Sequence, residues 1–111
     1  MIEVIVLNFL RQRLPYPVSM EVPVNPPDKF FVLQKVDSAR QDYIDTSMFI
    51  VWSYAESNFE AAKMNEIAKN AMDDLADLDA VSASKRAGDY PFPDAKLKRY
   101  RYQTVYNITH Y

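Results

Sequence analysis

Apolar residues recur every three or four positions along one long segment in the middle of the chain, from Ala61 to Leu78. Such spacing places them in a single stripe along an α-helix. Ser57 and Glu60 precede the stripe at the S-x-x-E spacing of a capping box, which satisfies free backbone amides at a helix start. The pattern predicts a helix over residues 57–78. The stripe residues that we expect in the core are Met64, Ala68 and Leu75.

The first residues also follow helical spacing and predict a helix over residues 2–13. Ile5 and Phe9 lie on its apolar side and are expected in the core. Arginines stand near its end, where cations suit the helix dipole. Pro15 and Pro17 then prevent the helix from continuing.

Four segments are predicted to form β-strands, and the first and the last of them have a clear period-two alternation. They are residues 18–22, 30–35, 43–54 and 100–108. The longest has apolar residues on both faces, so both faces are expected to be at least partly covered. Ile50 and Trp52 share one of these faces and are expected in the core, with Trp52 buried where the strand meets the following helix. Residues 36–42 are predicted to form a polar loop, and residues 79–98 an irregular segment.

The order α-β-β-β-α-β favours an α+β fold. We expect an antiparallel four-stranded sheet with two helices packed on one face. The chain has 111 residues, of which 49% are hydrophobic and 25% charged, which is typical of a single globular domain spanning residues 1–111.

Composition narrows the function classes. A net charge of −2 does not favour a general nucleic-acid binder, because affinity for a polyanion comes mainly from excess lysine and arginine. The chain has no cysteine, which excludes disulfides and thiol chemistry and fits a reducing cytosol. The apolar run at the start is too short to span a bilayer, so no membrane association is expected. The aromatic share of 14%, with eight tyrosines, suits half-buried sheet faces and interfaces.

Catalytic motifs are scarce. His110 is the only histidine and is expected to fray as the penultimate residue. Gly88 is the only glycine, which leaves no phosphate-binding loop of the P-loop or Rossmann type. The carboxylates Asp73, Asp74 and Asp77, together with Asp79, lack the loop of a calcium site and are interpreted as a solvated acidic helix end. We therefore expect no catalytic residue, cofactor or metal, and a protein that is not an enzyme.

The acidic cluster should oppose the dipole at the helix C-terminus, so a compensating set of cations is expected. The candidate set is Lys96, Lys98, Arg99 and Arg101, at the entry to the last predicted strand. Pairing within one chain is the interpretation we favour, and pairing between chains would instead give a head-to-tail contact that builds a ring or filament. The segment 96–102 also mixes cations and tyrosines, as a single-strand nucleic-acid platform does, but a solvated strand face explains it better.

Several short segments resemble the tail-terminator, or tail-completion, proteins of long-tailed bacteriophages. They are Tyr16-Pro17-Val18, Pro26-Pro27-Asp28-Lys29-Phe30-Phe31-Val32, Phe49-Ile50-Val51-Trp52-Ser53-Tyr54-Ala55, Glu60-Ala61-Ala62, Tyr90-Pro91-Phe92-Pro93-Asp94 and Arg99-Tyr100-Arg101-Tyr102-Gln103-Thr104-Val105. The resemblance covers most of the chain and rests on spacing and residue type, without a catalytic signature.

The resemblance implies a structural protein that caps the tail tube as a homo-oligomeric ring, usually a hexamer, and offers a docking surface to the head. Its partners would be further copies of itself, the tail-tube protein and the head–tail connector, without membrane or sequence-specific nucleic acid. It would reside in the virion neck, after assembly in the bacterial cytoplasm. The contact elements are then expected at residues 36–42, which include Asp37 and Arg40, and at residues 79–98.

Two alternatives stay open on the sequence. One is another phage neck, head–tail connector or minor tail component. The other is a small cytosolic adaptor or nucleic-acid-binding module.

Overall fold

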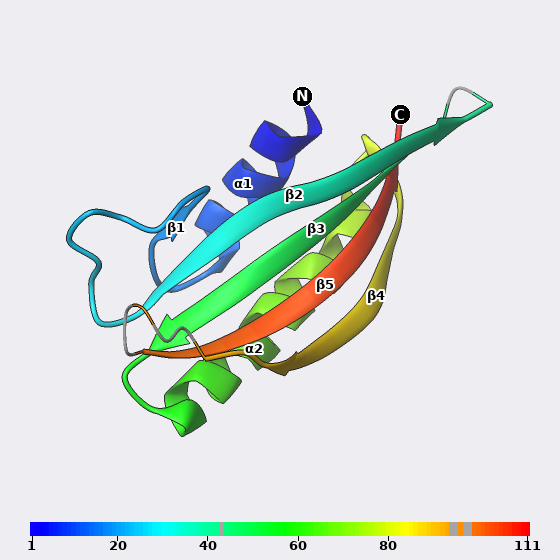
Figure 1. Cartoon of the computed structure of the whole chain (residues 1–111). Coiled ribbons are helices and arrows are strands. Elements are labelled where there is room, and N and C mark those ends of the chain that lie inside the picture. The colour runs from blue at the N-terminus through cyan, green and yellow to red at the C-terminus, as the bar shows by residue number, and fades with distance from the viewer. Residues whose placement is uncertain (43, 94–95, 97–98) are drawn as a thin grey trace.

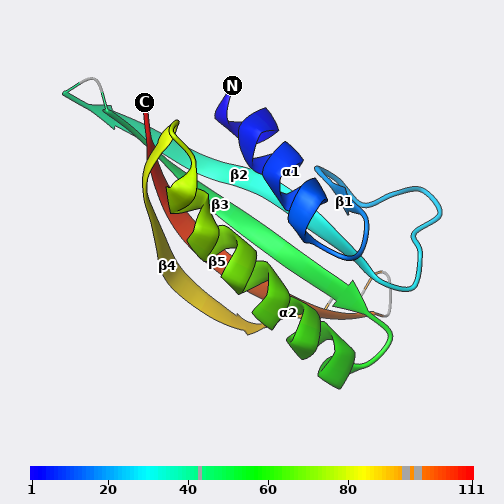
Figure 2. The same ribbon diagram turned by 180° about the vertical axis from the view of Figure 1, so that it is seen from behind.

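In the computed structural model, which describes residues 1–42, 44–93, 96 and 99–111, five strands form one sheet, and two α-helices pack on the same face of it. Figure 1 views the sheet from its open face, and Figure 2 shows both helices lying across the other face. The α+β class is confirmed. The elements in chain order are α1 (Ile2–Arg13), β1 (Val18–Ser19), β2 (Phe30–Gln41), β3 (Ile44–Ala55), α2 (Asn58–Asp73), the 3₁₀ turn η1 (Asp74–Asp77), β4 (Val81–Pro91) and β5 (Tyr100–His110).

Helix α2 begins where the capping box placed it. Ser57 has extended backbone angles, and its hydroxyl accepts a hydrogen bond from the Glu60 amide at 3.2 Å. The α-helix ends at Asp73, and the chain continues as the 3₁₀ turn to Asp77. The predicted helix therefore has the right start, but its last turn is tighter than an α-helix.

The main core fills the space between the helices and the sheet. The predicted core residues Met64, Ala68 and Leu75 are all buried there. Phe9 is partly buried against the same cluster, and Ile5 is also only half-buried. The largest side chains that the sheet contributes to this core are Phe31, Leu33, Phe49, Tyr106 and Ile108.

The prediction that Trp52 is buried between strand and helix is wrong. Phe49 and Val51 belong to the helix-side core, so the alternation of β3 turns Ile50 and Trp52 to the open face of the sheet. Both side chains are half-buried there. Trp52 packs against a smaller cluster formed by Phe30, Val32 and Tyr54. The apolar pattern of β3 showed that both faces are covered, but it did not show which face the helices cover.

The sheet has five strands in the order β1-β2-β3-β5-β4, so the expectation of a four-stranded antiparallel sheet is wrong. The strand β4 pairs with β5 and occupies most of the segment predicted to be irregular. It is an edge strand with mostly exposed side chains and two irregularities in its register, so it lacks a clear alternation of apolar and polar residues. The predicted strand at 18–22 is only two residues long, and it pairs parallel to β2.

The predicted loop at residues 36–42 is a continuation of β2 instead. Strands β2 and β3 pair along their full length as far as Gln41 and Ile44, with an irregularity between Lys35 and Asp37. Asp42 has a positive φ of 53°, as a tight hairpin turn requires. The predicted start of β3, Tyr43, lies outside the described residues. Figure 1 shows this hairpin projecting beyond the rest of the molecule. With the hairpin included, the molecule measures 43 × 24 × 24 Å.

Candidate assembly surfaces

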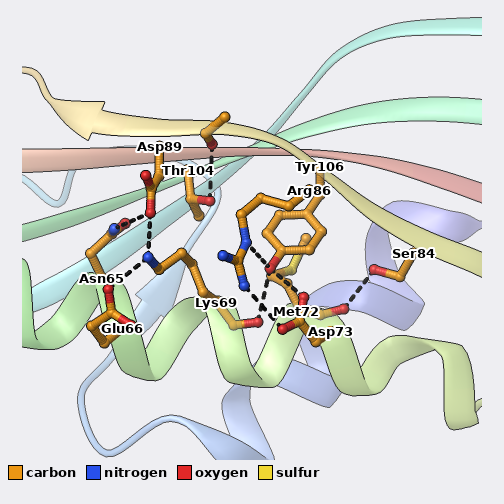
Figure 3. A network of polar contacts seen from close by, with 11 residues as sticks. Asn65, Glu66, Lys69, Met72, Asp73, Ser84, Arg86, Asp89, Thr104 and Tyr106 are labelled. Carbon is orange, nitrogen blue, oxygen red and sulfur yellow. Dashed lines mark hydrogen bonds and ion pairs between the residues drawn. The ribbon is translucent and has the colours of Figure 1, made fainter.

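A polar network fastens α2 to the edge strand β4 (Figure 3). Lys69 is only 8% exposed, and its ammonium donates a hydrogen bond to the Asp89 carboxylate. It also pairs with Glu66 at 2.6 Å, and Asn65 donates to Asp89 at 3.4 Å. The hydrogen bonds that Lys69 donates, first to Asp89 and then to Glu66, raise the pKa of Lys69 above its ordinary value. The buried ammonium is thus compensated, and the two elements are held together.

Tyr106 forms the second half of this network. Its ring is fully buried, and its hydroxyl lies 2.5 Å from an Asp73 carboxylate oxygen and 3.0 Å from the Lys69 carbonyl. Arg86 donates to the same hydroxyl at 3.1 Å and also pairs with Asp73 at 3.1 Å. Burial raises the pKa of Tyr106 to about 12. These contacts give the end of α2 a fixed position over β5, so we assign the network a structural role.

Alkaline pH is expected to destabilise the fold through this network. Tyr106 and Lys69 both have raised pKa values in the folded chain, so the folded chain keeps their protons at pH values where the unfolded chain loses them. For the tyrosine, this loss in the unfolded chain begins near its ordinary pKa of 10.0. The stabilisation is complete below the unfolded pKa and is lost as pH rises through about 12. Urea unfolding at about pH 8 and about pH 11.5 should show a smaller alkaline loss in Tyr106→Phe than in the wild type. Equal losses in the two proteins would contradict the role given to this phenol.

The arginines at the start of β5 are used within the chain. The Arg101 guanidinium lies 4.7 Å from the Phe92 ring centroid and 5.1 Å from that of Trp52, and it donates to the Phe92 carbonyl at 2.7 Å. Arg99 donates to the carbonyls of Pro27 and Asp28 at 2.6 and 3.0 Å. Both predicted interface cations therefore tie surrounding segments to this end of the sheet.

The acidic residues at the end of α2 pair with other cations than those predicted. Asp74 pairs with Arg13 of α1 at 2.7 Å, and Asp73 pairs with Arg86 of β4. Pairing within the chain therefore occurs, but its partners are cations far from Lys96 and Arg99 in sequence. Asp77 is exposed and forms no ion pair with any residue that the structure describes. Because α2 ends near the C-terminus and β5 begins at the opposite end of the sheet, Asp77 and Arg99 lie at opposite ends of the molecule (Figure 2).

The remaining predicted interface residues are spread over several surfaces. Arg40 is exposed near the hairpin tip and lies 3.6 Å from Asp45 across the two strands. Asp37 lies on the open face of the sheet, where its carboxylate accepts a hydrogen bond from the Ser38 amide. Lys96 is exposed. Lys98 and the Asp94 of the Tyr-Pro-Phe-Pro-Asp motif lie outside the described residues.

His110 is held in place, contrary to the expectation that it frays. It ends β5 opposite Asp45, is only 7% exposed, and lies 2.9 Å from the Ser47 hydroxyl through its Nε2 atom. A hollow of about 520 Å³ adjoins this pair, with Lys35 and Arg40 in its wall. Ser47 is 1% exposed, so its hydroxyl is closed to a substrate, and the contact joins the ends of β3 and β5.

No model of a known protein family matches this chain, and no curated protein is significantly similar to it.

Two absences hold for the part of the chain that the structure describes. Neither of its α-helices is long and apolar enough to cross a bilayer. Among the same residues, histidine and acidic side chains do not gather in a group of three or more that could hold a metal ion.

Sequence reasoning missed the network around Lys69, although a signal was present. Asn65 and Lys69 are four residues apart and interrupt the apolar stripe of α2 on its buried side. Two polar residues at that spacing need buried partners, so they indicate a facing polar strand. The partners Arg86 and Asp89 could not be identified, because β4 was not predicted as a strand.

Proposed function

We propose that this chain is a structural protein of a long-tailed bacteriophage that caps the tail tube as a homo-oligomeric ring. In this role it ends tail polymerisation and offers a docking surface to the head. The proposal starts from the sequence resemblance and draws physical support from the shape of the fold. Further copies of the chain, the tail-tube protein and the head–tail connector would be its partners. The ring would belong to the virion neck and form in the bacterial cytoplasm.

The observation that carries the proposal is the β2–β3 hairpin. Every described side chain from Lys35 to Ile44 is exposed, including Val36 at 46% and Ile44 at 43%. Extended backbone without core contacts costs conformational entropy and gains little burial within its own chain. A paired arm of this length is well suited to reach a neighbouring subunit or the tube, where its apolar residues become buried.

Charge at the two ends of the molecule adds a second line of support. Asp77 is exposed at the end near the C-terminus, and Lys96 is exposed near the start of β5. A contact between unlike ends is heterologous, and repeating it closes a ring when the rotation per subunit divides a full turn. Exposed ion pairs are weak and screened by salt, so the hairpin contact would supply more of the affinity than the charges do.

Electron microscopy of the negatively stained protein tests the proposal directly. We expect closed rings of uniform diameter at low salt, and fewer rings in Asp77→Lys, because the reversal places like charges at the proposed seam. The matched control is Lys63→Asp, a charge reversal at an exposed position on α2. Circular dichroism should be the same for all three proteins. If rings are equally abundant in Asp77→Lys, the charged ends are not part of the contact between subunits. If the wild-type protein forms no rings at any concentration tested, the proposal is contradicted.

A further inference from the structure

On the open face of the sheet, residues paired across the strands form three rows. The rows cross β2, β3, β5 and β4, in the strand order that can be followed in Figure 1. The middle row is Asp37, Met48, Asn107 and Lys85. The row nearer the hairpin tip is Ala39, Thr46, Thr109 and Ala83. The row on the other side is Gln34, Ile50, Val105 and Gly88.

In these three rows the two central strands carry apolar and uncharged polar side chains, and the charges stand at the two sides. Met48, Ile50 and Val105 are half-buried, with no helix over them. Asp37 on β2 and Lys85 on β4 are exposed at the two ends of the middle row. Neither of them forms an ion pair with a described residue. Three strand spacings separate them, roughly 14 Å, which is too far for a direct pair.

The three rows are complementary to the same rows of a second copy whose strand order is reversed. A two-fold axis parallel to the strands, between β3 and β5, would lay β2 of one copy over β4 of the other. Asp37 then faces Lys85 of the second copy, and the same pair forms again on the other side. Alanine meets alanine and threonine meets threonine in the outer row. Ile50 meets Val105, which keeps the centre apolar.

Gly88 fits this arrangement as well. The long Gln34 side chain of the second copy would point at Gly88. Because glycine has no side chain, there is room for Gln34 at this position. A Cβ atom built at Gly88 would meet nothing within 4 Å in its own chain, so the fold of a single chain does not require a glycine here. A two-fold axis across the strands would instead set Asp37 against Asp37, so the charges select the axis parallel to them.

We propose that two copies of this chain pack face to face through these rows and form an isologous dimer. Two sheets in such a sandwich lie about 10 Å apart with their strands nearly aligned. The footprint, four strands wide and about five residues long, is on the order of 300 Å² per copy. Standard stable interfaces bury about 800 Å² per partner, so the dimer should be weak, with a dissociation constant on the order of 100 μM.

This contact is separable from the proposed ring, although Asp37 and Ala39 lie at the base of the same hairpin. It leaves free the ends of the molecule and the hairpin tip beyond Ala39 and Thr46. A chain in which Asn-Gly replaces residues 40–45 would lose the tip but keep Ala39 and Thr46. It should still form the dimer even though it cannot form the ring. Failure of one contact is therefore distinguishable from failure of the other.

Charge exchange across the face tests the dimer. All proteins in this experiment carry the shortened hairpin. Sedimentation velocity would be measured from about 10 μM to about 1 mM for the chain without further changes, for Asp37→Lys, for Lys85→Asp and for the double exchange. Each single reversal turns two attractive pairs into two repulsive ones and should raise the dissociation constant at least about tenfold. The double exchange restores opposite charges and should return it to within about threefold of the wild type. Lys63→Asp on α2 is the control and should have no effect.

Three results would overturn the dimer. The first is a mass that stays at that of one shortened chain at every concentration. The second is a wild-type affinity in both single reversals. The third is a double exchange that remains as weak as the single variants. Circular dichroism of each variant shows whether the fold is intact, and Asp37, Lys85 and Lys63 are all exposed in the single chain.

Discussion

Replacing Phe49 with alanine should unfold much of this protein at 37 °C. Phe49 is fully buried in the main core, between the helices and the sheet. Removing a buried aromatic ring leaves a cavity and costs about 3–5 kcal/mol, a large fraction of the stability of a domain of this size. The midpoint of thermal unfolding should fall by roughly 10–30 °C, which circular dichroism would measure.

The matched control is Trp52→Ala, three residues further along the same strand. Trp52 is larger but lies on the open face, where it is half-buried and donates a hydrogen bond to Gln103 at 2.8 Å. Its removal should cost clearly less than the removal of Phe49, because water can occupy the space it leaves. A larger loss in Trp52→Ala than in Phe49→Ala would mean that the helices cover the other face of the sheet.

Shortening the β2–β3 hairpin should abolish assembly while leaving the fold stable. Ala39 and Thr46 are paired directly across the two strands, so Asn-Gly can replace residues 40–45 as a two-residue turn without changing the register. The removed residues that the structure describes are outside the core, and Arg40 and Asp45 leave together as a pair. We expect the unfolding free energy to change by less than about 1 kcal/mol.

The effect on assembly should be large, because the shortened chain lacks the arm that reaches its neighbour. The concentration needed to form the ring should rise at least about a hundredfold, since a contact of this kind contributes several kcal/mol. Arg40→Ala, which keeps the arm but removes one charge, is the control and should have a much smaller effect. Rings that form equally well from the shortened chain would show that the hairpin is not a contact element.

The helices were predictable because each has a strong local signal. Ser57 caps α2 in the structure as its spacing with Glu60 predicts, and the stripe that includes Met64 and Ala68 is buried. Such features depend on residues within one or two turns, so they can be recognised without knowledge of the rest of the chain. The α+β class followed from the order of these elements.

The errors arose where pairing with a neighbouring strand, and not an apolar pattern, decides the structure. Residues 36–42 and 81–91 are polar, and the backbone of each segment is fixed by its pairing with a neighbouring strand. Edge and protruding strands do not need an apolar face, so the period-two signal is weak in both. The face on which Trp52 lies was equally undetermined, because alternation along β3 is apolar on both sides.

The charged residues of the candidate surfaces show the same limit. Their abundance near the ends of α2 and β5 was visible in the sequence, but the partners Arg13 and Arg86 came from distant segments. Arg99 and Arg101 were predicted at an interface, and the structure shows them in contacts within the chain. The complementary rows of the open face depend on the register of four strands, so no local pattern could reveal them.

The solution mass of the wild-type protein, measured by multi-angle light scattering over a concentration and salt series, tests the proposed ring most directly. The expected result is a discrete species near six times the 12.9 kDa of one chain at low salt, which shrinks when salt is raised or the hairpin is shortened. A mass that stays at one or two chains under every condition would contradict the ring.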